Sequence, residues 1–242
     1  MNAVSRVPRP SLLSKCLLSK HLLRTAGAAL LGALLSSCAM VATQGVSSLD
    51  FQAAPDRFSL DPGALLTDQR VPAWQLVGVR EALRRAPPGS VILTCWKGAS
   101  LTNFWGPCSH ISRKFGADTV AETLNFTSGG TGVFPVSQLY DRYAVIVLDA
   151  GVRPQHMAAL RAEIARTGGK PYGFGNHPNT YYCSTYQNAL QRAMGLPDVV
   201  PFNHRWSVYL PADVLLQKNV RVLWVGVRGM GEAAAASAAN RP

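Results

Sequence analysis

Hydrophobic and polar positions repeat along residues 72–228 with two different periods, one typical of strands and one of helices. Short apolar or alternating runs predict strands at 90–94, 108–114, 119–126, 143–148 and 220–227. Apolar residues at helical spacing predict helices at 72–86, 155–167 and 184–194. Pro87 and Pro88 close the first of these helices and Gly195 ends the last, because proline cannot continue a helix and glycine readily adopts the terminal conformation. The mixture predicts an α+β domain.

The flanking regions lack such periods. Residues 38–71 mix Gln, Gly, Ser, Asp and Pro, and we expect a linker there, with partial packing against the domain as the alternative. Residues 229–242 are rich in alanine and predict a disordered tail. The glycine-rich stretch 128–132 lacks the Lys-Ser/Thr pair of a phosphate-binding loop, so a mobile loop beside a site is the expectation.

The first 37 residues have the pattern of a signal peptide. Scattered bases precede an apolar run at 26–35, which is too short to cross a bilayer comfortably. The residues that follow, Leu35-Ser36-Ser37-Cys38, resemble a bacterial lipobox, where cleavage leaves a diacylated cysteine. We therefore expect lipidation at Cys38 and a protein of the bacterial cell envelope, anchored to a membrane and facing the periplasm. The alternative is a plain signal peptide with a cysteine placed there by chance.

The basic charge of the chain is concentrated in this leader. The whole sequence has 24 Lys and Arg against 13 Asp and Glu, a formal net charge of +11, and five of the bases lie within residues 1–37, where no acid occurs. Without the leader, 19 bases face 13 acids and the net charge falls to +6. No long basic block remains, so we do not expect a nucleic-acid partner.

The exported part keeps three cysteines, an odd number for an oxidising compartment. At most one disulfide can form, and Cys95 with Cys108 is the favoured pair if the two face each other on neighbouring strands. Cys183 then stays free. No CxxC pair and no HExxH motif occurs, so we expect no metal and no cofactor.

Cys183 is the candidate nucleophile because a loop rich in Gly, Pro and Asn leads into the helix predicted at 184–194. Unpaired amides and the positive end of the helix dipole favour a thiolate at such a position and can hold an oxyanion. The alternative is a small apolar filler, since free cysteine is among the most buried residue types.

A nucleophilic thiol needs a base, and His110 has the best setting because its strand can project the ring toward a helix terminus. The other histidines of the exported part are His156, His177 and His204, of which His177 remains an alternative base. Glu122 lies twelve residues after His110 in the next predicted strand. A three-residue connection at 115–117 would set the two opposite each other, within reach of a hydrogen bond that orients the imidazole.

Five segments occur in the order of the motifs of the YiiX/YaeF-type proteins, which are circularly permuted papain-like cysteine hydrolases. They are GSVILT (89–94), SHIS (109–112), AET (121–123), GKPYGF (169–174) and YYCST (181–185). The sequence resembles this family over residues 88–195. It departs from the family pattern at Ser90, Gly173 and Thr185, where the family has acidic residues.

The resemblance implies a permuted papain-like, NlpC-like domain over 72–228, with an antiparallel barrel-like sheet followed by the nucleophile helix. It implies Cys183 as nucleophile, His110 as base and Glu122 as its orienting acid, with Tyr182 as a candidate for substrate binding or the oxyanion site. The expected reaction is hydrolysis of an amide through an acyl-enzyme, with a cell-wall peptide as the leading substrate. The alternatives are an acyltransferase or lipid hydrolase of the lecithin-retinol-acyltransferase type, and an envelope binding module without catalysis.

Overall fold

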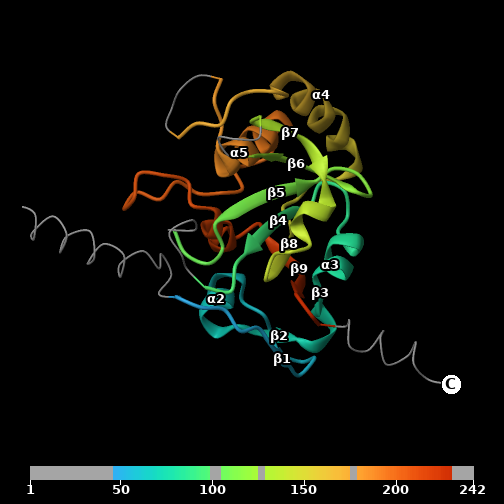
Figure 1. Ribbon diagram of the computed structural model, residues 1–242, viewed down its shortest axis with the longest axis vertical. Helices are drawn as coiled ribbons and strands as arrows, with labels where there is room; N and C mark the ends of the chain where they lie inside the picture. The colour runs from blue at the N-terminus through green and yellow to red at the C-terminus, as the bar shows by residue number, and fades with distance from the viewer. Residues whose placement is uncertain (1–45, 99–104, 125–128, 175–178, 231–242) are drawn as a thin grey trace, which may run out of the picture. The chain divides into compact units, whose positions relative to one another are not determined.

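The computed structural model describes residues 46–98, 105–124, 129–174 and 179–230, which belong to one compact unit, Ala42–Pro242 (Figure 1). The strands are β1 (Gln52–Ala54), β2 (Arg70–Pro72), β3 (Leu76–Gly78), β4 (Val91–Cys95), β5 (His110–Lys114), β6 (Thr119–Thr123), β7 (Thr131–Pro135), β8 (Ala144–Asp149) and β9 (Arg221–Val227). The α-helices are α2 (Leu65–Asp68), α3 (Val79–Arg85), α4 (Met157–Thr167) and α5 (Cys183–Ala193). Short 3-10 helices are η2 (Pro62–Ala64), η3 (Ala73–Gln75), η4 (Val136–Leu139), η5 (Pro154–His156) and η6 (Pro211–Leu216).

Seven strands of the described part form one mixed sheet in the order β3-β9-β8-β4-β5-β6-β7. Every pair is antiparallel except β3 with β9. The strand order has two ends, β3 and β7, so the expected barrel-like sheet is an open one in the described residues. Strands β1 and β2 pair in parallel as a separate two-stranded sheet. The α+β class expected from the sequence is confirmed.

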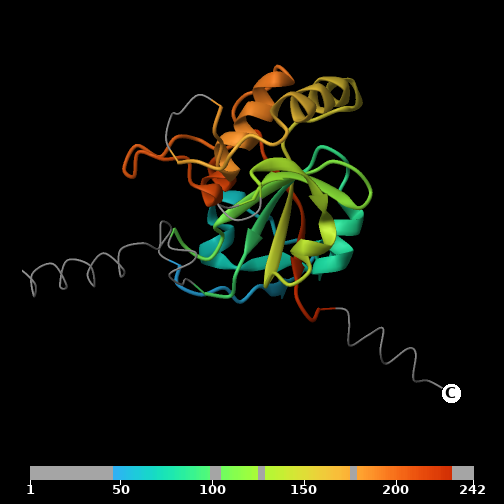
Figure 2. The ribbon, with the colours of Figure 1, turned by 45° about the horizontal axis from the view of Figure 1, so that its top comes forward.

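Helices cover both faces of the large sheet (Figure 2). Helix α5 packs on β5 and β6, with α4 beside it, and α3 packs on β8 and β9. The neighbours Val120 and Ala121 divide the two sides: Val120 packs with the α3 cluster and Ala121 with Tyr186 and Leu190 of α5. Since successive strand residues point to opposite faces, α3 and α5 lie on opposite sides of the sheet.

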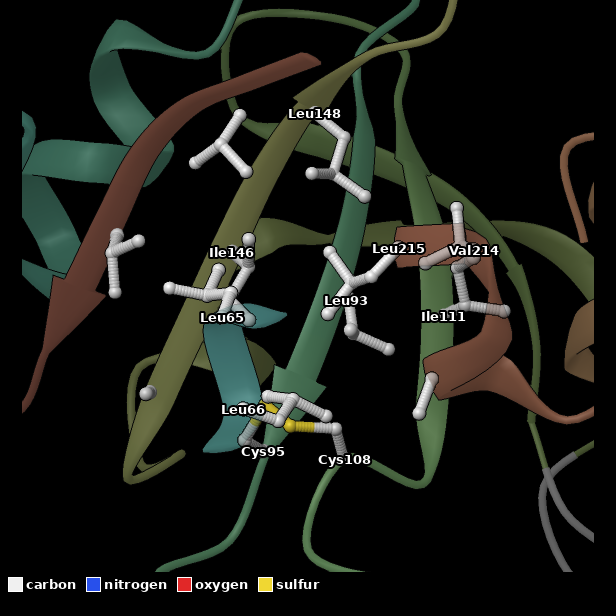
Figure 3. Close-up of a cluster of buried hydrophobic side chains, with 14 of the residues drawn as sticks. Leu65, Leu66, Leu93, Cys95, Cys108, Ile111, Ile146, Leu148, Val214 and Leu215 are labelled. Atoms are coloured by element: carbon white, nitrogen blue, oxygen red, sulfur yellow. A yellow bond between two sulfur atoms is a disulfide. The ribbon is translucent and has the colours of Figure 1, made fainter. Parts of the chain in front are cut away.

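The main core lies around β4, all five residues of which are buried. Figure 3 shows Leu93 of β4 beside Ile111 of β5 and Ile146 of β8, with Leu65 and Leu66 of α2 closing over them. The disulfide between Cys95 and Cys108 lies at the end of this cluster, and Cys183 is free. The pairing favoured from the sequence is therefore confirmed.

Residues 46–71 of the segment expected as a linker are packed against the domain, as in the partly packed alternative. Leu49, Phe51 and Val71 are buried in the main core together with α2, and β1 pairs with β2. Their apolar side chains are spaced irregularly, because each reaches the core from a turn or a short strand instead of a long periodic element. Cys38 and residues 1–37 lie outside the described residues.

Two further elements differ from expectation. The helix expected at 72–86 begins only at Val79, because Leu76–Gly78 pair with β9 and form a strand. The loop expected at 128–132 is in part the strand β7, paired with β6. Gly130, which directly precedes β7, has φ +79°, and a Cβ there would meet the Lys170 carbonyl. The close approach of the chain at Gly130 to the chain at Lys170 therefore requires glycine.

The other sequence-predicted strands and helices are confirmed, with ends that differ by at most three residues. Gly229 and Met230 of the expected tail are described as a turn, and the rest of the tail lies outside the described residues. Within the described segments, no helix combines the length and the apolar character needed to cross a bilayer.

Candidate active site

His110 is the first residue of β5 and faces Thr94 across the β4–β5 ladder. Its imidazole remains 22% exposed, whereas the Glu122 side chain beside it is 1% exposed. The Nε2 atom of His110 lies 2.5 Å from Oε2 of Glu122. The expected contact between base and orienting acid is therefore present in the structure.

The route by which the two side chains meet differs from the expected one. β5 and β6 pair through Arg113 with Ala121 and Lys114 with Val120. This register, continued along the strands, places Glu122 opposite residue 112, two positions from the predicted partner. Because side chains alternate with a period of two, a two-residue shift keeps His110 and Glu122 on the same face as diagonal neighbours. The expected connection of three residues was too short, because five residues, 115–119, lie between the paired residues Lys114 and Val120.

Gln138 is a member of the site that the sequence did not indicate. It lies on η4, and its side-chain amide donates a hydrogen bond to Oε1 of Glu122, the oxygen that His110 leaves open. Arg142 follows one turn later. Burial lowers the pKa of Arg142 overall, although the nearby charges of Glu122 and Asp141 oppose this, so its guanidinium lies within electrostatic reach of Glu122. A fully buried carboxylate thus has partners on both oxygens, as buried charges require.

Cys183 is the first residue of α5, as the loop-to-helix pattern predicted. Its side chain is buried, with 5% exposure. Thr185, two residues later, accepts a hydrogen bond at Oγ1 from the Tyr182 amide at 3.0 Å and so closes the start of the helix. The amides of the first helical turn have no acceptor within the helix, which makes them candidate donors to an oxyanion.

Cys183 lies close enough to His110 to act on the protonation of its imidazole. Burial on its own lowers the pKa of His110, but hydrogen bonds to Cys183 and Glu122, together with the charges of these two groups, outweigh it and raise the pKa to about 10. His110 is therefore protonated at neutral pH. Since its Nε2 faces Glu122, Nδ1 is the ring nitrogen left for Cys183. The imidazole of His110 thus lies between Glu122 and Cys183, an arrangement in which it can exchange a proton with the thiol of a cysteine nucleophile.

Tyr182 packs in the core, with 4% exposure and its ring 5.1 Å from that of Phe174. Its hydroxyl oxygen accepts a hydrogen bond from the Tyr209 amide at 2.8 Å. Burial and the charge of Cys183 raise the pKa of both Tyr182 and Tyr172, so neither phenol is ionised beside the thiol. This geometry favours a packing role for the Tyr182 side chain over contact with a substrate.

The other two described histidines, His156 and His204, have different partners. His156 accepts a hydrogen bond at Nδ1 from the Arg153 amide at 3.1 Å, as a helix cap would. His204 packs edge-on against Phe202, with ring centroids 5.2 Å apart. His177, the alternative base, lies outside the described residues. The described segments contain no cluster of three or more His, Cys, Asp and Glu side chains suited to hold a metal ion.

Comparison with known proteins finds a structural likeness but no match by sequence. No family model matches the chain, and neither does any curated protein. The crystal structure described as metalloprotein YiiX from Escherichia coli O157:H7, DUF1105, is similar, with a TM-score of 0.46 and 16% sequence identity. That similarity covers 58% of this chain and 99% of YiiX.

Proposed function

We propose that this protein is a cysteine hydrolase that cleaves an amide bond through an acyl-enzyme. The contact of one imidazole with both a thiol and a buried carboxylate is the observation that carries the proposal. A histidine that only packed or capped a helix would have no need of both partners. Cys183 is the nucleophile, His110 the acid and base, and Glu122 the group that fixes the ring.

The proposed fold assignment is the permuted papain-like one. Three features support it: the order His, Glu, Cys along the chain, a mainly antiparallel sheet that precedes the nucleophile helix, and the thiol at the first residue of that helix. The segments SHIS and YYCST, found at the start of β5 and at the start of α5, also support this assignment.

The reaction follows from the resting ion pair. The Cys183 thiolate attacks the carbonyl carbon, and the tetrahedral oxyanion accepts hydrogen bonds from amides of the first turn of α5. The C–N bond breaks as His110 gives its proton to the leaving amine, which leaves a thioester and a neutral imidazole. Water then attacks the thioester while His110 takes its proton. The acid leaves, and the thiolate–imidazolium pair returns.

The substrate we propose is a cell-wall peptide, met by a protein anchored to a membrane through lipid on Cys38. The signal-peptide pattern and the lipobox support this location, and the formal charge of +6 without the leader suits a surface beside anionic polymers. Replacing Cys38 by Ala tests the anchor: radioactive palmitate labelling should disappear and the protein should leave the membrane fraction. Palmitate labelling that survives this substitution overturns the proposed lipid anchor at Cys38.

One experiment tests the reaction and the substrate class together. Purified protein is incubated with cell-wall peptide fragments in one arm and with phospholipid vesicles in the other, and products and protein adducts are followed by intact mass. Cys183→Ala is the matched control, because it removes the sulfur and leaves the backbone amides in place. Cleaved peptide that depends on Cys183 supports the proposal. Acyl transfer in the lipid arm alone would mean that the substrate is a lipid and not a cell-wall peptide. An unreactive Cys183 with no product in either arm would favour a binding module without catalysis.

A further inference from the structure

A single buried side chain, Gln187 on α5, contacts both strands that carry the partners of Cys183. Its Oε1 accepts a hydrogen bond from Nε of Arg113 on β5 at 3.1 Å. Its Nε2 donates to the carbonyl oxygen of Ala121 on β6, also at 3.1 Å. The side chain is fully buried, with 0% exposure. One amide group therefore joins α5 to two neighbouring strands of the sheet.

These contacts are close in the sequence to all three proposed catalytic residues. Arg113 follows His110 by three residues on β5, and Ala121 directly precedes Glu122 on β6. Gln187 follows Cys183 by four residues, about one helical turn. Arg113 and Ala121 are also direct partners in the β5–β6 ladder. The amide of Gln187 thus contacts a directly paired residue on each of the two strands and so joins the helix to the β5–β6 ladder.

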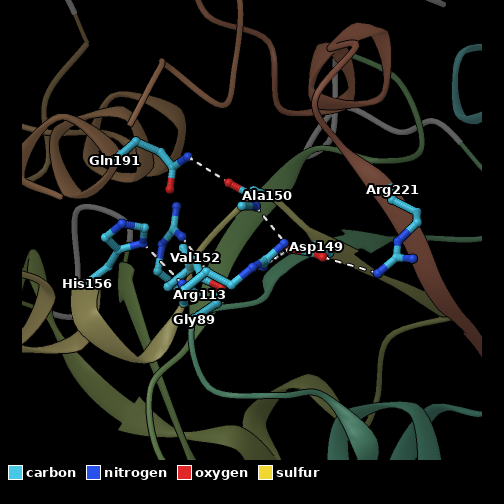
Figure 4. A network of polar contacts seen from close by, with 10 residues as sticks. Gly89, Arg113, Asp149, Ala150, Val152, His156, Gln191 and Arg221 are labelled. Atoms are coloured by element: carbon cyan, nitrogen blue, oxygen red, sulfur yellow. Dashed lines mark hydrogen bonds and ion pairs between the residues drawn. The ribbon is translucent and has the colours of Figure 1, made fainter. Parts of the chain in front are cut away.

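Burial of Arg113 at this contact costs free energy of folding, because a charged side chain loses its hydration. It is fully buried, and burial lowers its pKa to about 9. One nitrogen, Nη1, donates to the Gly89 carbonyl at 3.0 Å, whereas Nη2 has no hydrogen-bond partner in the described structure (Figure 4). A buried guanidinium held only by neutral acceptors stabilises a fold less than an apolar side chain of similar size would. The contact therefore suits a geometric role better than a stabilising one.

The other described contacts of α5 with β6 are apolar and include no directional hydrogen bond. Tyr186 and Leu190 pack on Ala121 through apolar surface, and apolar contact is non-directional. Hydrogen bonds from a buried amide have narrow limits of distance and angle, so they fix where a helix stands. A displacement of about 1 Å at a reacting group is enough to lower a rate greatly.

We propose that Gln187 is a positioning residue, which sets the place of the Cys183 thiol relative to His110 and Glu122 by holding α5 to β5 and β6 at once. This inference rests on the proposed function, because it concerns the contact that activates the thiol. Four charged or titratable groups interact with the Cys183–His110 pair or with its partner acid. They are Glu122 from β6, Arg142 through the charge of Glu122, and the phenols of Tyr172 and Tyr182 through the charge of Cys183.

The test compares two glutamines of the same helix. Gln187→Met removes the contact while keeping the length of the side chain. Gln191→Met is the matched control, because Gln191 is also fully buried but donates to the carbonyls of Ala150 and Pro197, which lie on neither β5 nor β6 (Figure 4 shows the bond to Ala150). The readout is the rate at which iodoacetamide alkylates Cys183 in the purified full chain, measured by peptide mass from about pH 5 to pH 9. Thermal unfolding of each variant is recorded alongside.

We expect Gln187→Met to lower the alkylation rate near pH 6 by about tenfold or more, toward that of an ordinary thiol, and Gln191→Met to leave the profile unchanged at a similar loss of stability. In the His110→Ala background, Gln187→Met should cause no further loss. Equal profiles for the two methionine variants overturn the positioning role. A wild-type thiol that already reacts like a model thiol overturns the proposed function instead.

Gln187→Glu keeps the test decisive if the methionine variant does not fold. It retains the acceptor for Arg113 and loses the donor to Ala121, so the helix stays attached to β5 alone. We expect a loss of low-pH reactivity between those of wild type and Gln187→Met. A profile equal to wild type would show that the bond to β6 is not needed, and would overturn the two-strand account.

Discussion

The imidazole of His110 meets the carboxylate of Glu122 diagonally across two antiparallel strands, with Nε2 and Oε2 2.5 Å apart. Diagonal positions on one face are about 7–8 Å apart, farther than direct partners, and only long side chains bridge that distance. The contact therefore depends on the length of the glutamate as well as on its charge.

Glu122→Asp keeps the charge and shortens the side chain by one methylene. Because the diagonal contact needs that length, we expect this variant to lose turnover to about the same degree as Glu122→Gln, on the order of one to four powers of ten. Steady-state turnover on the substrate identified by the mass experiment is the measurement. An aspartate variant close to wild type would mean that the carboxylate need not touch the ring.

The three proposed catalytic residues should act as a unit. Cys183→Ala and His110→Ala should each remove nearly all turnover, and adding Glu122→Gln to His110→Ala should cost little more, because an orienting acid has no effect without its imidazole. A double-mutant cycle on turnover measures this. Fully additive losses would assign Glu122 to substrate binding or to fold stability, and the same series on His177 would then follow.

The raised pKa of His110 predicts a specific dependence of stability on pH. The folded pKa, about 10, lies above the ordinary value of 6.5, so protonated His110 stabilises the fold fully below pH 6.5. This contribution declines as pH rises from 6.5 and is lost above about 10. Denaturant unfolding at several pH values should show wild type losing stability relative to His110→Gln over this interval. A constant difference between the two proteins would contradict the raised pKa.

Gln138 should matter to the reaction although it does not touch the thiol. Gln138→Leu removes the donor to Oε1 of Glu122 and leaves a fully buried carboxylate with one partner fewer. Loss of a hydrogen bond to a charged group costs about 1.5–3 kcal/mol, which corresponds to roughly a tenfold or greater fall in turnover if the ionised carboxylate is what orients the ring. A Gln138→Leu variant with lower stability but an unchanged pH profile of Cys183 alkylation would contradict a role of Gln138 in the reaction.

The disulfide should stabilise the domain without taking part in the reaction. It joins Cys95 and Cys108 across 13 residues, and closing a loop of this size stabilises a fold by about 3 kcal/mol in the chain-entropy account. We expect the double substitution of these cysteines by Ala to lower the free energy of unfolding by roughly that amount. Non-reducing mass mapping should find Cys183 free in every preparation. A bridge that includes Cys183 in active protein would be incompatible with its role as nucleophile.

The sequence by itself determined the elements whose signals are local. The short apolar run at 90–94 predicts β4, the helical spacing of Met157, Leu160 and Ile164 predicts α4, and the passage from loop to helix places Cys183 at a helix start. Each depends on residues within one or two turns or along one strand, where periodicity and turn chemistry act directly. The triad candidates were found for the same reason, since each lies within a short motif.

Only the tertiary structure decided the rest. The packing of residues 46–71, the strand at Leu76–Gly78, the β5–β6 register, and the contacts of Gln138 and Gln187 depend on partners distant in the chain. Gln187 meets Ala121 from 66 residues away, and nothing in the local pattern of either segment encodes that approach. Polar amide side chains such as those of Gln138 and Gln187 form no periodic pattern in the sequence. Their roles depend on the buried donors and acceptors that lie next to them in the folded core.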